Sequence, residues 1–222
     1  MKNFTQLQIE IPDGFHTLGL EGDDAYREDC IREMADLVWS EGTDLQRDTM
    51  AAVYDEMAGT FADDGAFYAG VCFVGMEDDR VSTASVVARL DDTDATDADL
   101  VATGLAEALS HTTTDVSVTR VPAGPCVVSF HGSEWVPAEG AEPLGIARVD
   151  AQIPVPSRAQ LLTLSLSTPS LTELPVYVNL LRLIAETVAV VDAESPSDAS
   201  DPGAEVVTGQ RNVADEMRST FG

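Results

Sequence analysis

The chain has 222 residues, and 44% of them are hydrophobic, which is ordinary composition for a globular protein with one sizeable core. Its 39 acidic and 12 basic residues give a formal net charge of -27 at pH 7. A field of that sign repels phosphate, so the composition argues against nucleic acids and anionic membrane surfaces as direct partners.

The acidic residues are spread over many segments, and Lys2 is the only lysine. This distribution favours a compositional bias that serves solubility, as in a high-GC or salt-adapted cell. The alternative interpretation is an acidic surface for a basic partner, or a mimic of nucleic acid.

The first predicted elements are a strand and a pair of helices. Residues 6–11 alternate between polar and apolar, which predicts a half-buried strand. Two helices follow as an αα-hairpin, and Thr43 and Gln46 have the capping-box spacing that starts the second helix. The apolar face predicted for the first helix consists of Tyr26, Cys30, Met34, Leu37 and Val38. The face predicted for the second helix consists of Met50, Val53, Tyr54, Met57 and Phe61.

The rest of the core is predicted to consist of hairpins and two further helices. The nearly continuous apolar run at residues 66–74 is typical of a central strand that is covered on both faces. An acidic stretch at residues 91–99 leads into a helix, where negative charge is favourable at the N-terminus. The last helix starts near Thr172, with Pro175 in its first turn. In chain order, these strands are predicted at residues 66–74, 81–90, 116–121, 126–131, 147–155 and 161–167, and the helices at residues 97–110 and 172–191.

The composition changes after residue 191, where Ser, Pro, Asp and Gly replace the apolar pattern. Residues 192–222 are therefore predicted to be a flexible acidic linker that ends in a short helix. Residues 1–191 are predicted to form one domain, because their elements follow one another without a linker. The short hairpin connections predict an α+β fold, with a mostly antiparallel, bent sheet of about seven strands and helices packed on its faces.

The second half of this domain resembles a known group of proteins. Residues 149–171 read VDAQIPVPSRAQLLTLSLSTPSL, which is a strand ending in Pro-x-Pro, a hairpin, and a strand ending in Ser-Thr-Pro. The residues that carry the resemblance are Pro154, Pro156, Ser167, Thr168 and Pro169. With the helix that follows, the segment is similar to uncharacterised actinobacterial proteins and to the PsbP-like α/β/α sandwich. The resemblance implies a binding module and no catalytic residues. Asp150 and Gln152 of this segment are expected to face solvent.

No catalytic residue, metal ligand or cofactor is predicted from motifs. Ser129 and His131 lie two apart on a predicted strand and so share a face, but such a pair is commonly just part of a polar sheet surface. Cys126 lies five residues from His131, which places the two on opposite faces. Residues 92–103 begin like a calcium loop, but Asp97 stands where the sixth position requires Gly. Neither GxGxxG nor GxxxxGK[ST] is present.

The three cysteines and the hydropathy pattern bear on the cellular compartment. Cys30, Cys72 and Cys126 are odd in number and widely separated, which fits neither a disulfide framework nor a CxxC metal site. Each lies in an apolar element, so we predict buried, reduced thiols. No segment has the pattern of a transmembrane helix or a signal peptide, and we therefore expect a cytoplasmic protein.

The residues predicted to bind a partner are Trp135, Val213, Met217 and Phe221. Trp135 lies in a predicted loop, where large aromatic residues are common at interfaces, although packing over the end of the sheet is the alternative. The other three would form the apolar face of the terminal helix. These features favour a non-enzymatic adaptor, chaperone or assembly factor with a basic protein partner. The alternatives are a structural subunit of a larger assembly and a hydrolase with dispersed site residues around His131.

Overall fold

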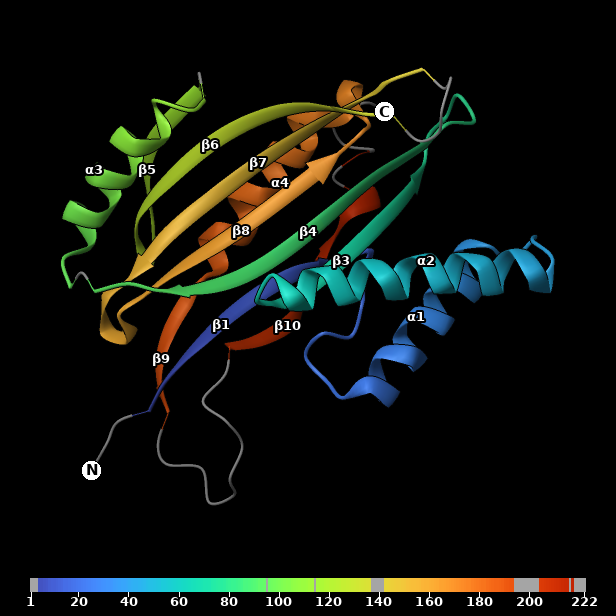
Figure 1. Ribbon diagram of the computed structural model, residues 1–222, viewed down its shortest axis with the longest axis horizontal. Coiled ribbons are helices and arrows are strands. Elements are labelled where there is room, and N and C mark those ends of the chain that lie inside the picture. Colours follow the sequence, from blue (N-terminus) through green and yellow to red (C-terminus); the bar gives the residue numbers. More distant parts are fainter. Residues whose placement is uncertain are drawn as a thin grey trace.

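The computed structural model describes residues 4–94, 96–113, 115–136, 142–193, 204–215 and 217. This part of the chain forms two β-sheets and several helices (Figure 1). The helices are α1 (Asp24–Val38), α2 (Asp44–Asp63), α3 (Ala98–Leu109) and α4 (Leu174–Thr187), with the short 3-10 helices η1 (Pro156–Arg158) and η2 (Leu171–Glu173). The large sheet has the order β2-β3-β4-β8-β7-β6-β5, with β2 (Phe15–Thr17), β3 (Ala66–Gly75), β4 (Val81–Asp92), β8 (Gln160–Thr168), β7 (Leu144–Val155), β6 (Gly124–Trp135) and β5 (Asp115–Val121). The small sheet has the order β10-β1-β9, with β10 (Ala204–Asn212), β1 (Phe4–Asp13) and β9 (Ala189–Ala193).

The predicted fold class is confirmed. The large sheet has seven strands, and every neighbouring pair in it is antiparallel. Helices pack on both of its faces: α1, α2 and α3 lie on the side toward the viewer in Figure 1, which we call the front face, and α4 lies on the rear face. The hairpins β3–β4, β5–β6 and β7–β8 occur where the turn signals predicted them.

The strand predicted at residues 6–11 is β1, but it belongs to the small sheet rather than to the large one. Its alternation is as predicted, because Leu7, Ile9 and Ile11 are buried and Glu10 is exposed. The small sheet includes β9 and β10, neither of which was predicted. The last helix was predicted to reach residue 191, but it ends at Thr187, because Val188 has an extended backbone and begins the turn into β9.

The C-terminal segment differs from the predicted flexible linker. Residues 194–203 lie outside the described residues, but β10 pairs in parallel with β1, starting with Leu7 opposite Ala204. Val213 and Met217 then pack into the same core as β1 and α4. Because β1 would otherwise present an open edge next to a buried apolar face, the returning strand completes the small sheet. The described part of the terminal segment is therefore part of the fold.

The rear core lies between the large sheet and a layer made of α4 and the small sheet. The apolar face of α4 consists of Val176, Tyr177, Leu180, Leu181, Ile184 and Ala185, which are all buried. They pack with Leu162, Leu164 and Leu166 of β8 and with Leu7 and Ile9 of β1, each of which is fully buried. A separate front core forms where α1 and α2 cover β3.

The face that α1 turns toward the sheet differs from the predicted one. Met34 is buried as predicted, together with Ile31 and Ala35, at the i, i+3, i+4 spacing of one helical stripe. Tyr26 and Leu37 were predicted on the buried face but are 43% and 61% exposed. The stripe that includes Ile31 and Ala35 presents smaller and better-fitting side chains to β3, so Leu37 is rotated out to solvent.

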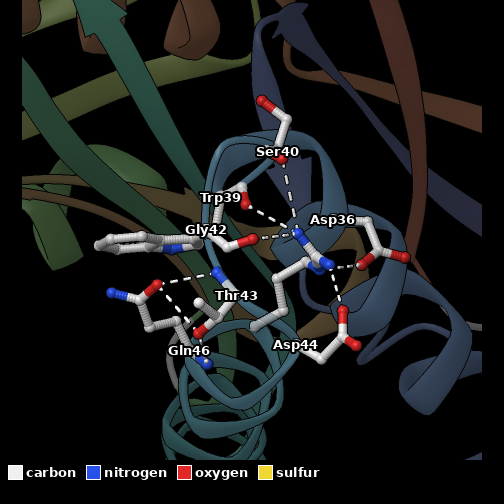
Figure 2. Close-up of polar contacts among 8 residues, drawn as sticks. Asp36, Trp39, Ser40, Gly42, Thr43, Asp44 and Gln46 are labelled. Atoms are coloured by element: carbon white, nitrogen blue, oxygen red, sulfur yellow. Dashed lines mark hydrogen bonds and ion pairs between the residues drawn. The ribbon is translucent and has the colours of Figure 1, made fainter.

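The αα-hairpin is held closed by Arg47 and by the predicted capping box (Figure 2). The Thr43 hydroxyl accepts from the backbone N–H of Gln46, and the Gln46 side chain accepts from the backbone N–H of Thr43. The Arg47 guanidinium donates to the carbonyl oxygen of Gly42 at 2.7 Å and reaches those of Trp39 and Ser40. It also pairs with Asp36 and Asp44. One planar cation therefore satisfies the carbonyl groups at the end of α1 and ties them to the start of α2.

Replacement of Arg47 is expected to destabilise the hairpin. Arg47→Ala should lower the free energy of unfolding by about 1–3 kcal/mol, since it leaves part-buried carbonyl groups without their charged donor. Arg47→Lys should recover only part of this loss, because an ammonium cannot reproduce the planar fork. Urea denaturation measures both values. The matched control is Arg120→Ala, because Arg120 pairs with Asp99 but is 72% exposed and should change stability by less than about 1 kcal/mol. Equal losses at the two positions would contradict this account.

The three cysteines are free thiols, and Cys72 and Cys126 are buried as predicted, whereas Cys30 is only half-buried. Burial raises the pKa of the Cys72 and Cys126 thiols to about 11 from 9.0. That shift leaves about a hundredfold less thiolate at neutral pH, and only the thiolate reacts with alkylating agents.

Iodoacetamide should therefore modify Cys30 of the native protein at least about tenfold faster than Cys72 or Cys126. Peptide mass spectrometry after timed quenching measures the three rates. In denaturing guanidinium chloride the rates should become equal, because the desolvation that raises the pKa is lost. If Cys72 reacted as fast as Cys30 in the native state, the rear core would not be closed.

Candidate functional site

Four cross-strand pairs on β6 and β7 form a continuous strip on the front face of the large sheet. The strip consists of the pairs Trp135–Leu144, Ser133–Ile146, His131–Arg148 and Ser129–Asp150. Side chains alternate between the faces of a strand, so every second residue of β6 and β7 shares this face. We call these eight residues the β6–β7 strip. It is apolar at the end of the hairpin and polar toward the middle of the sheet.

The outer end of the strip exposes two large apolar side chains. Trp135 is 52% exposed, and its cross-strand partner Leu144 is 40% exposed. Trp135 was predicted in a loop, but that prediction is wrong, because β6 continues to Trp135 and pairs there with β7. The indole is therefore attached to a paired strand rather than to a connecting segment.

The inner end of the strip is a network of polar side chains. The Ser129 hydroxyl lies 3.2 Å from His131 Nε2, and the same nitrogen lies 3.5 Å from Asp150 Oδ2. Arg148 Nε donates to the other oxygen, Asp150 Oδ1, at 2.8 Å. Asp150 was expected to face solvent, but it is 4% exposed because His131 and Arg148 flank it on the same face. The face shared by Ser129 and His131 is as predicted.

This network does not have the geometry of a catalytic triad. In a triad, the serine and the carboxylate contact different nitrogens of the histidine, so that one nitrogen accepts the serine proton while the other is held. Here Ser129 and Asp150 both approach Nε2. Ser129 is also 1% exposed, so a substrate carbonyl could not reach its hydroxyl without rearrangement. What the network does is hold Asp150 between Arg148 and His131, which orients both of their side chains toward solvent.

The structure separates the residues that were predicted to act together. Val213 and Met217 are 0% and 2% exposed in the rear core, whereas Trp135 lies on the front face of the large sheet. Phe221 lies outside the described residues. A partner could contact Val213 or Met217 only if the terminal segment left the core, and their role in binding stays a prediction.

Two further observations concern the described residues. None of their His, Cys, Asp and Glu side chains form a group of three or more that could hold a metal ion. No helix among them is long and apolar enough to cross a membrane.

Comparison with known proteins identified no matching family model, no matching curated protein and no matching solved structure. The resemblance to the PsbP-like sandwich therefore stays a prediction.

The burial of Met217 can be tested through stability. Met217→Ala should lower the free energy of unfolding by about 2–5 kcal/mol, as expected for truncating a methionine inside a packed core. Leu45→Ala, at a position on α2 that is 76% exposed, should change it by less than about 0.5 kcal/mol. Both values come from chemical denaturation of the full chain. A Met217→Ala protein as stable as the Leu45→Ala protein would show that the terminal segment is not docked.

Proposed function

We propose that this protein is a non-enzymatic binding module, an adaptor or assembly factor that recognises a protein partner through the β6–β7 strip. The observation that carries the proposal is the half-exposed Trp135, which lies beside Leu144 on a paired strand and in line with the exposed Arg148. Tryptophan and arginine are the residue types most enriched among the energetic hot spots of protein interfaces.

The rigidity of the strip supports this function. Trp135 and Leu144 are attached to strands whose backbones are hydrogen-bonded to each other, and the Arg148 side chain is already oriented by Asp150. A surface that is ordered before binding loses little conformational freedom when it binds, so more of the contact energy appears as affinity. The network around His131 thus has a positioning role in this proposal rather than a catalytic one.

The charge of the chain indicates the chemistry of the partner. With a net charge of -27, the protein attracts positively charged surfaces over long distances and repels a second copy of itself. The partner that fits is a basic protein with an apolar depression for the Trp135 ring and acceptor groups opposite Arg148. The alternative of a structural subunit would use the same surface in a particle of constant stoichiometry.

The proposal is tested by placing a photo-crosslinking amino acid at position 135 in living cells, with position 45 as the matched exposed control. A discrete adduct is expected from position 135 and not from position 45. The crosslinked protein is then purified and its dissociation constant measured. Trp135→Ala should weaken binding by about 30-fold or more, as for a hot-spot residue, while Leu45→Ala should leave it unchanged.

Salt provides an independent readout. The association rate should fall as the salt concentration rises, because exposed charges that steer the encounter are screened. An affinity that is the same for the wild-type protein and Trp135→Ala would overturn the role of the strip. An association rate that does not depend on salt would overturn the basic character of the partner.

A further inference from the structure

A cavity on the rear side of the molecule, away from the β6–β7 strip, lies where the end of β3, the β3–β4 turn, the start of α4 and the terminal segment meet. Its volume is about 550 Å3, within the range of roughly 300–1,000 Å3 that small-molecule sites span. Its wall contains the apolar side chains of Met76 and Met217, both of which border the rear core. The cavity is therefore large enough and apolar enough to hold a small organic molecule.

The wall of this cavity also contains a buried carboxylate that is only partly satisfied. Glu173 is 1% exposed, and its Oε1 accepts from Arg80 Nη2 at 3.0 Å. Its Oε2 is shielded from water and has no hydrogen-bond partner in the described part of the chain. An ionised carboxylate has about four acceptor positions, and a buried one that is left without donors is costly. Supply of a further donor from within the cavity would remove that cost.

The neighbouring side chains do not supply this donor. Arg80, which is half exposed, directs its Nε to Asp78 at 2.7 Å. The hydroxyl group of Tyr177, on the next turn of α4, is engaged with Ser82 at 2.8 Å. Three acidic residues, Glu77, Asp78 and Glu173, line the cavity against one arginine, so its charge complement is a cation.

We propose that this cavity binds a small aliphatic amine, whose ammonium group donates to Glu173 and whose carbon chain packs against Met76 and Met217. An ammonium group supplies three donors and a positive charge, which matches an acceptor-only carboxylate in a negatively charged wall. The thioether side chains of methionine adapt to irregular apolar ligands.

The test uses n-pentylamine as the probe and 1-pentanol as its neutral control of similar size, with salt added to equalise ionic strength. The methionine methyl groups of the full chain are labelled with 13C and observed by NMR at neutral pH. The amine should shift the Met76 and Met217 signals in a saturable way and leave the remaining methionines in place. The alcohol should bind at least about tenfold more weakly, because it cannot neutralise the carboxylate.

Two variants locate the effect. Glu173→Gln should abolish the preference for the amine over the alcohol, whereas Glu107→Gln, an exposed position on α3, should keep it. No saturable shift at Met76 and Met217 of the wild-type protein would overturn the proposal, and so would equal affinities for amine and alcohol. This comparison on the wild-type protein decides the matter even if Glu173→Gln does not fold. A folded Glu173→Gln protein that still prefers the amine would also overturn it.

Discussion

The burial of α4 between the large sheet and the small sheet is the interaction on which the rest of the structure depends. Tyr177, Leu180 and Ile184 are at most 1% exposed, and α4 contacts β1 as well as β7 and β8. Each such side chain contributes about 1.5–3 kcal/mol when it is removed from water. The hydroxyl group of Tyr177 is satisfied by Ser82, so this burial leaves no polar cost at the centre. Because α4 holds the rear of β7, the residues that alternate with that packing, including Arg148 and Asp150, keep a defined position on the front face.

The elements that the sequence predicted well are those that local signals define. The capping box of α2 and the turns between paired strands act over a few residues, and the structure has each of them. The division into two sheets could not be predicted in this way. Leu7 pairs with Ala204 across nearly the whole chain, and a strand's alternation does not say which sheet it joins. The composition of the C-terminal segment predicted a flexible linker, but tertiary pairing with β1 overrides composition for residues 204–212.

The candidate site was predictable only to the same extent. The spacing of Ser129 and His131 placed them on one face, since that inference needs only the period of a strand. The contact with Asp150 depends on the register between β6 and β7, which the sequence does not specify to one residue. Trp135 was recognised as a binding residue by its type, although its position at the end of a paired strand was not anticipated. Glu173 left no signal, because its environment is assembled from β3, β4, α4 and the terminal segment.

The central place of β1 in the small sheet has a consequence for synthesis of the chain on the ribosome. Both neighbours of β1 come from the C-terminal end, β9 after α4 and β10 after that. The N-terminal strand therefore emerges first but acquires its partners last. Until then, Leu7, Ile9 and Ile11 have no sheet partner and none of the rear core that α4 supplies. During translation, the nascent chain carries an apolar segment with two open strand edges, which is the kind of segment that chaperones bind and that aggregates when left uncovered.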